Sequence, residues 1–330
     1  ASVLEISHRS KAFDGILENT LSNLKRLLGV GGDHEVVLLQ GGASLQFSMV
    51  PMNFLASHSG EANYIVTGTW GKSGLREASR VGNSHVAWDG VEEGYNRLPS
   101  AEEVTLSKNP AYVHVTSNET IQGVQWQAIP TFQNVPLICD SSSDFLSRPV
   151  DIADYGMLYA CAQKNAGIAG VTVAVIRRDL LSRSQEKLPA MLNYQTFVEK
   201  GSRPNTPPVF AVYILGLVCE WILNDVGGLE HIAARNAAKV SKVYDVIDSS
   251  EGFFRGHACP ASRSIMNVTF RLPSEELEAA FVKNAAAEGL SDLKGHRSVG
   301  GIRASIYNAM PAEGVDALCQ FMSNFKSSHG

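Results

Sequence analysis

Short apolar runs alternate with helical or loop stretches over much of this chain, from about residue 35 to about residue 225. The runs read EVVLLQ, NYIVTG, SHVAW, AYVHVT, VPLICD, MLYACA and VTVAVI. Strands that alternate with helices build mostly parallel sheets whose two faces are both covered by helices. The pattern therefore predicts an α/β fold around a mostly parallel sheet.

The pattern changes beyond residue 226. A long helix over about 230–249, a strand in SIMNVTFRL, a helix in SEELEAAFVKNAAAEG, a strand near GIRASIYN and a final helix form an α+β unit. We expect a large domain over residues 1–225 and a smaller C-terminal domain over residues 226–330.

The stretch around NTPP predicts the start of a helix. Asn205 or Thr206 can cap it, and proline is tolerated in a first helical turn, where its missing N–H is not needed. The apolar run that follows, FAVYILGLVCEWIL, contains Glu220 and is short for a bilayer span, so we expect a buried helix and no membrane partner.

Charge and cysteine usage exclude several classes of protein. The net charge of -5 gives no sign of nucleic-acid binding. The five cysteines are odd in number, scattered and never spaced as CxxC, which favours a reducing compartment over a disulfide framework or a zinc site. We expect a cytoplasmic protein without a metal, while an organelle reached after removal of a transit peptide stays open.

Asp140 and Lys164 are the strongest candidates for chemistry. Asp140 ends the apolar strand VPLICD, and Lys164 follows the strand MLYACA. Ligands of open α/β sheets bind beyond the carboxyl ends of the strands, so both side chains are expected at one crevice. A lysine that forms a Schiff base and an acid that holds the ring nitrogen are what pyridoxal phosphate requires. A structural ion pair, or two unrelated surface residues, is the plainer alternative.

The stretch LLQGGASLQF runs from a strand through a small-residue turn into a helix. Backbone amides of Ala43 and Ser44 at that helix N-terminus are suited to a phosphate. The stretch lacks the GK[ST] ending of a Walker loop and is not a dinucleotide fingerprint. An ordinary strand-to-helix turn without a ligand is an equally good interpretation of the local sequence.

Six motifs occur in order over essentially the whole chain: LEISHRS, LLQGGASLQFSMVPMN, SNETIQG, AQKNAGIAGVTV, NTPP and GHRSVGGIRASIYNAMP. Together they resemble the phosphoserine aminotransferase family of class V, fold-type I pyridoxal-phosphate enzymes. The resemblance implies a large domain with a seven-stranded, mostly parallel sheet and a smaller C-terminal α+β domain. It also implies ping-pong transfer of an amino group from L-glutamate to 3-phosphohydroxypyruvate, which gives O-phospho-L-serine and 2-oxoglutarate.

The resemblance implies roles for particular residues. Lys164 and Asp140 are the catalytic pair, with Lys164 as Schiff-base lysine and proton carrier and Asp140 on the pyridinium nitrogen. The cofactor pyridoxal 5'-phosphate is expected to contact Ala43, Ser44, Trp70, Thr120, Asp140, Gln163, Lys164, Asn205 and Thr206. Trp70 is expected to stack on the ring, although an isolated tryptophan more often serves as core or interface packing.

The implied substrates carry two anionic ends and need cations. Arg303 resembles the arginine that forks onto the α-carboxylate. His8, Arg9, His296 and Arg297 resemble the cluster that grips the distal phosphate or the glutamate side chain. The resemblance places Asn205 and Thr206 in the site of a second subunit, so a homodimer with shared active sites is expected.

Two departures from the family pattern are visible. The N-terminal Gly-Pro segment usual before SVLEISHRS is missing, which implies an incomplete sequence or compromised activity, and Ser44 stands where some members carry an arginine. Two alternatives therefore stay open. One is another class V reaction, such as alanine or serine:glyoxylate transamination, and the other is a non-catalytic homologue.

Overall fold

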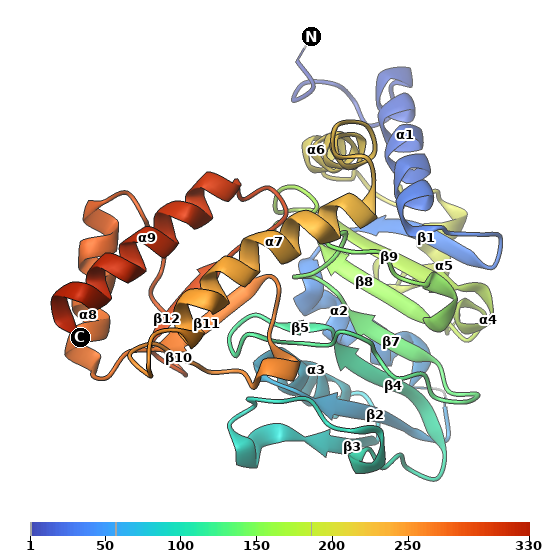
Figure 1. Cartoon of the computed structure of the whole chain (residues 1–330). Helices are drawn as coiled ribbons and strands as arrows, with labels where there is room; N and C mark the ends of the chain where they lie inside the picture. Colours follow the sequence, from blue (N-terminus) through green and yellow to red (C-terminus); the bar gives the residue numbers. More distant parts are fainter. Residues whose placement is uncertain (1, 57, 186) are drawn as a thin grey trace.

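The computed structural model describes residues 2–56, 58–185 and 187–330 (Figure 1). A seven-stranded sheet forms its larger part, with strand order β1-β9-β8-β7-β4-β2-β3. The strands are β1 (His34–Leu39), β2 (Glu61–Val66), β3 (Ser84–Asp89), β4 (Pro110–Thr116), β7 (Leu137–Asp140), β8 (Met157–Cys161) and β9 (Thr172–Arg177).

The sheet is parallel from β8 through β7, β4 and β2 to β3. Strand β9 runs against both of its neighbours, because it pairs antiparallel with β8 and with β1. The predicted α/β fold with a mostly parallel sheet is confirmed. Its strands read as continuous apolar runs because helices cover both faces.

Alternate residues of each strand enter two different cores. Val36 and Leu38 of β1 belong to the core beneath α1 (Lys11–Leu28) and α6 (Val209–Glu220). Val37 and Leu39 face the opposite side, toward α2 (Gly42–Phe54), α3 (Thr69–Ala78) and α5 (Tyr194–Glu199). The period-2 alternation of a strand thus supplies both layers with buried side chains.

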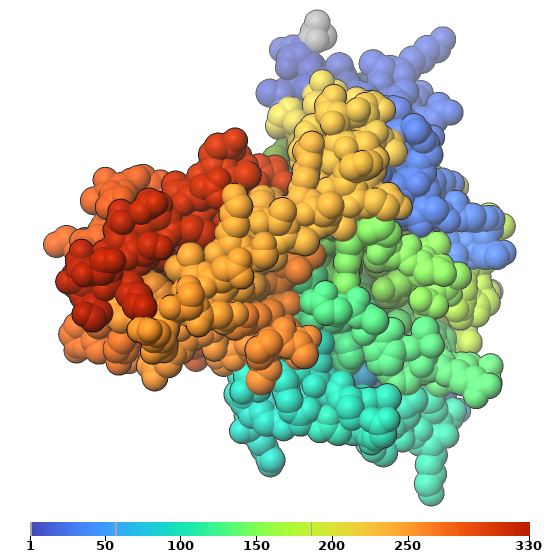
Figure 2. All heavy atoms as spheres, viewed as in Figure 1, coloured from blue at the N-terminus to red at the C-terminus, as the bar shows by residue number. Residues whose placement is uncertain are grey.

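A second unit stands out to one side of this body (Figure 2). Its antiparallel sheet has the order β10-β11-β12, formed by β10 (Arg255–Gly256), β11 (Asn267–Arg271) and β12 (Ile302–Ser305). The helices α7 (Leu229–Asp248), α8 (Glu275–Ala287) and α9 (Ala312–His329) pack with it.

Helix α7 joins the two units. Its first turns contribute Leu229 and Ile232 to a core of the large sheet, whereas Val240 and Val243 belong to the core of the smaller unit. The change from one core to the other therefore occurs within one 20-residue helix. The division at residue 226 stays a prediction.

The helix after NTPP differs from the expectation. It begins at Val209 with Pro208 at the N-cap position and no side-chain cap, so neither Asn205 nor Thr206 caps it. Both prolines lie before the helix because proline restricts the residue that precedes it to extended conformations.

This helix is also longer than expected. It continues through the π-helical turn η5 (Trp221–Val226), and the combined 209–226 segment is long and apolar enough to cross a membrane by length and composition alone. Core helices pass the same test, and Val212, Leu215 and Ile222 of this helix are fully buried.

The remaining described elements are short. They are β5 (Asn118–Glu119), β6 (Val124–Gln125), α4 (Arg178–Leu181) and the 3-10 turns η1 (Gly90–Glu93), η2 (Ala101–Glu103), η3 (Ile152–Asp154), η4 (Ala190–Leu192) and η6 (Pro260–Ser262).

Candidate active site

Asp140 and Lys164 follow adjacent strands and lie at the same edge of the sheet. Strand β7 ends at Asp140, which pairs in parallel register with Tyr159 of β8, and Lys164 follows three residues after β8 ends. A hydrogen bond of 3.2 Å from the Cys161 N–H to Ser142 Oγ ties the two strand ends together. The parallel pairing is therefore what brings the carboxylate and the amine to one place.

Both side chains line a cavity of about 240 Å³. Of the predicted site residues, it brings together Ala43, Ser44, Trp70, Asp140, Gln163 and Lys164. Eight further residues line it that the sequence did not single out, namely Gly41, Gly42, Phe47, Thr116, Asn118, Ser142, Ser143 and Cys161.

One wall of the cavity is the N-terminus of α2. Its N-cap residue, Gly41, has φ 89°, and no side chain caps the helix. A Cβ at Gly41 would also lie 2.5 Å from Leu45 Cδ2, so glycine is required there by both conformation and space. The first amides of α2 are left for an anion in the cavity.

Asp140 is almost completely buried. Its Oδ1 accepts the Ser142 N–H at 3.0 Å. Burial raises the pKa of the Asp140 carboxyl, while hydrogen bonding to Ser142 and the charge of Lys164 act in the opposite direction. A cation placed against this carboxylate would favour its ionised form.

Trp70 lies beside Lys164. The Lys164 Nζ is 5.5 Å from the centroid of the indole, in cation-π geometry. The indole Nε1–H donates to Thr120 Oγ1 at 2.9 Å, which places Thr120 at the edge of the indole although it does not line the cavity. A flat ring, an amine and a carboxylate thus converge on one small space.

The cavity fits a pyridine ring that carries a phosphate. The α2 N-terminus suits the phosphate, Asp140 suits the ring nitrogen and Lys164 suits an aldehyde. Thr116 Oγ1, which also belongs to the lining, is buried without a hydrogen-bond partner. Such an orphaned group is expected where a ligand completes the hydrogen bonding.

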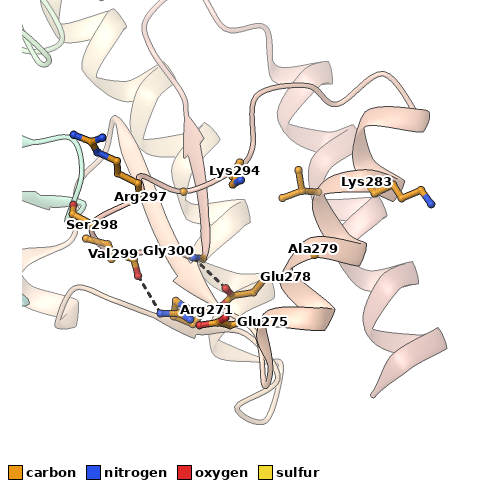
Figure 3. A pocket seen from close by; sticks show the side chains of 13 residues that line it. Arg271, Glu275, Glu278, Ala279, Lys283, Lys294, Arg297, Ser298, Val299 and Gly300 are labelled. Atoms are coloured by element: carbon orange, nitrogen blue, oxygen red, sulfur yellow. Dashed lines mark hydrogen bonds and ion pairs between the residues drawn. The ribbon is translucent and has the colours of Figure 1, made fainter.

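The predicted cationic residues lie outside this cavity. Arg303 is on β12, opposite Thr269 of β11. His296 Nδ1 contacts Ser298 Oγ at 2.7 Å, and Arg297 lines a separate pocket of about 710 Å³ on the smaller unit (Figure 3). In that view Arg297 points away from Lys294 and Lys283, so these cations do not converge on one point.

The remaining predicted residues gather near the N-terminal segment. His8 and Thr206 line one pocket together with the start of α6, and Arg9, the residue after His8, is exposed. Asn205 Oδ1 accepts from Gln40 Nε2 at 3.2 Å. Within the single chain, none of these residues lines the 240 Å³ cavity, and their roles stay predictions.

Comparison with known proteins accounts for this arrangement. The model of the family described as aminotransferase class-V matches residues 1–318. A phosphoserine aminotransferase of Rhodopirellula baltica is 51% identical over all of this chain and 88% of its own length. The chain belongs to the phosphoserine aminotransferase family of class V aminotransferases.

Solved structures of the family agree with the fold. The phosphoserine aminotransferase of Bacillus circulans subsp. alkalophilus is 49% identical, with a TM-score of 0.96 over 100% of this chain and 91% of that one. The one from Trichomonas vaginalis, described as bound to pyridoxal phosphate, is 38% identical, with a TM-score of 0.91 over 98% and 91% of the two chains. An aspartate aminotransferase of Thermus thermophilus, 16% identical with a TM-score of 0.78 over 98% and 93%, shares the fold alone.

Proposed function

We propose that this chain is a phosphoserine aminotransferase. It moves an amino group from L-glutamate to 3-phosphohydroxypyruvate and releases 2-oxoglutarate and O-phospho-L-serine. The observation that carries the proposal is the meeting of Lys164, Asp140, Trp70 and the uncapped α2 N-terminus around one cavity. The family membership adds the substrates.

The cofactor expected in this cavity is pyridoxal 5'-phosphate. Its phosphate would lie against Ala43 and Ser44, its ring nitrogen against Asp140 and its ring face against Trp70, with Gln163 at its edge. Thr120, which lies outside the cavity lining, would act through its hydrogen bond to the Trp70 indole. When bound, it supplies a ring that accepts the electrons released when a proton leaves the substrate's α-carbon.

The side chains divide the remaining chemistry. Lys164 would hold the cofactor between turnovers, and its amine, once released, would carry a proton away from the substrate's α-carbon. Asp140 would keep a proton on the facing ring nitrogen, because a buried carboxylate stabilises a cation placed against it. Trp70 covers one ring face, which excludes water and fixes the plane.

The substrates are dianions, and the predicted cations suit them. Arg303 is proposed for the α-carboxylate, because a guanidinium binds a carboxylate through two parallel hydrogen bonds. His8, Arg9, His296 and Arg297 are proposed for the distal phosphate or side-chain carboxylate.

These cations lie outside the cavity of their own chain, so we propose that a homodimer completes the site. Thr206 and His8 share a pocket with Leu4, Ile168 and Phe210, three large apolar side chains that are each more than a third exposed. A partner subunit on this surface would cover the apolar side chains and bring Asn205 and Thr206 toward a second cavity.

The proposed location is the cytoplasm. All five cysteines are free, and Cys139, Cys161 and Cys219 are buried. A chain without disulfides suits a reducing compartment.

The purified protein tests the function. We expect a visible absorbance band that disappears with L-glutamate and returns with 3-phosphohydroxypyruvate. Borohydride should fix the cofactor covalently on Lys164 and on no other lysine. Lys164→Ala should abolish transfer, whereas Lys108→Ala, at an exposed lysine outside the cavity, should leave it unchanged.

The same assay separates the alternatives. Faster transfer to glyoxylate or pyruvate than to 3-phosphohydroxypyruvate would indicate another class V reaction. A protein that shows no visible absorbance band after incubation with pyridoxal phosphate and removal of the unbound cofactor would be a non-catalytic homologue.

A further inference from the structure

Glu119 is a fully buried carboxylate next to the active site with no role in the mechanism above. It lies in the two-residue strand β5, and its side chain reaches the first turn of α3. Its Oε2 accepts the backbone N–H of Trp70 at 2.9 Å, and its Oε1 accepts the N–H of Gly71 at 2.7 Å. These are amides that a helix N-terminus leaves without intrahelical partners.

The helix itself offers no cap at this end. Its N-cap residue is Gly68, which has no side chain. A Cβ at Gly68 would lie 2.6 Å from Glu119 Cδ and 2.7 Å from Gln122 Oε1. The glycine therefore leaves room for a cap that comes from another part of the chain.

The contact extends to the neighbours of Glu119. Thr120 accepts from the indole of Trp70, and Gln122 Nε2 donates to Thr69 Oγ1 at 2.9 Å. Trp70 is therefore held at three points. Glu119 binds its backbone N–H, Thr120 binds its indole, and Gln122 binds the preceding residue, Thr69. Trp70 cannot turn its ring without breaking at least one of these hydrogen bonds.

The charge of Glu119 has no direct counter-ion. Among the described residues no ion pair reaches it, and the titratable groups that face it are Asp140, Lys164 and Tyr95. Burial raises the pKa of Glu119 to about 7, and the two backbone N–H groups oppose that shift. Capping a helix with a buried carboxylate costs more desolvation free energy than capping it with a serine or threonine hydroxyl, which are among the commonest caps.

We propose that Glu119 is a positioning residue of the active site, which holds the indole plane of Trp70 for the cofactor by capping α3 from outside. The inference rests on the proposed function, because it assigns Trp70 to the cofactor ring. Glu119 itself does not line the 240 Å³ cavity.

The test compares the wild-type chain with Glu119→Gln. Glutamine keeps the size but offers one acceptor oxygen in place of two, so one of the two helix amides loses its partner. In the cofactor-free full chain, we expect hydrogen exchange at Trp70 and Gly71 to rise roughly tenfold, the equivalent of one lost hydrogen bond. Exchange in β8 and in α9 should not change.

The holoenzyme supplies a second readout. The circular dichroism that the protein induces in the bound cofactor depends on a fixed ring plane, and we expect this signal, per cofactor bound, to fall by about half in Glu119→Gln. Asp151→Asn is the matched control, because Asp151 also caps a short helix through Ala153 N–H but lies outside the site.

Two results would overturn the proposal. One is unchanged exchange at Trp70 and Gly71, and the other is a lower melting temperature with an unchanged cofactor signal. If the wild-type chain binds no cofactor, the proposed function fails, while the exchange experiment still decides whether Glu119 holds α3.

Discussion

The backbone N–H of Asn308 donates to the side-chain Oδ1 of Asn165 at 3.0 Å, and Asn165 is the residue after Lys164. The Nδ2 of the same Asn165 donates to the carbonyl of Ser143 at 3.1 Å. One buried amide thus joins the lysine segment, the loop after Asp140 and the smaller unit. The position of Lys164 is coupled to that unit through a single side chain.

Asn165→Ala should therefore reduce both stability and turnover. It leaves the Asn308 N–H and the Ser143 carbonyl buried without these partners, which costs about 1–3 kcal/mol. Urea unfolding and steady-state kinetics measure the two effects. Asn324→Ala removes a hydrogen bond with Gln320 on an exposed face of α9 and should change neither. Full activity in Asn165→Ala would contradict the coupling.

Lys239 should matter more to stability than its neighbour Lys242. The buried Lys239 Nζ donates to three carbonyls, those of Tyr307, Asn308 and Met310. Lys239→Met should lower the free energy of unfolding by about 2 kcal/mol, because those carbonyls lose their donor.

The matched control is Lys242→Met on the same helix. Lys242 pairs with Asp316 at the surface, and exposed pairs contribute less than about 1 kcal/mol. Equal losses in the two variants, measured by denaturant unfolding, would contradict the role given to the three carbonyls.

Glu119 should give the cofactor-free chain a specific dependence on pH. Its pKa is raised from 4.5 to about 7 in the folded chain, so the folded state binds the proton more tightly than the unfolded state. The contribution of the Glu119 proton to the free energy of unfolding is full below pH 4.5, and it is lost as the pH rises to about 7. Between pH 5 and pH 8, the free energy of unfolding should fall more for the wild type than for Glu119→Gln. If the free energies of unfolding of the wild type and Glu119→Gln differ by the same amount at both pH values, the pKa of Glu119 is not raised.

Gly68→Ala should disturb the site although it adds a single methyl group. That methyl would overlap the Glu119 carboxyl, and such overpacking costs about 1–3 kcal/mol. We expect weaker cofactor binding, measured by equilibrium titration, together with a lower melting temperature. Gly15→Ala is the control, because an added Cβ there meets nothing within 4 Å and alanine favours a helix interior.

Phe210→Asp should dissociate the proposed dimer. The side chain is 38% exposed beside Leu4 and Ile168, and a carboxylate there would face the partner's apolar surface. Sedimentation should show a monomer, and activity should fall with it if the cations come from the partner subunit. An active monomer would contradict the shared site.

The sequence predicted those parts of the site that depend on strand ends. Asp140 and Lys164 were expected side by side because each follows an apolar run, and adjacent parallel strands finish at one edge. Ala43 and Ser44, expected from the small-residue turn before a helix, also line the cavity, and their role toward a phosphate stays a prediction. Each of these predictions used a local pattern, namely an apolar run with the residue that follows it, or a turn with the helix that follows it.

Glu119 was missed for a physical reason. Its partners are backbone amides of residues 70 and 71, and a backbone amide leaves no mark in the sequence. The sequence also does not show that Gly68 leaves space for the Glu119 side chain, because many glycines occur in turns for other reasons. The predicted start of α6 is wrong because two tendencies of proline compete. Proline is tolerated in a first helical turn, but it also keeps the residue before it extended, and here the second tendency prevails.

The pairing of β1 with β9 constrains how the chain acquires its shape during synthesis. The register joins His34 to Arg177, so β1 is made more than a hundred residues before β9, its neighbour within the described part of the sheet. Contacts so distant along the chain form slowly, and an unpaired apolar edge invites aggregation meanwhile. The apolar VVLL segment of β1 is therefore open to self-association until VTVAVI of β9 is available to pair with it.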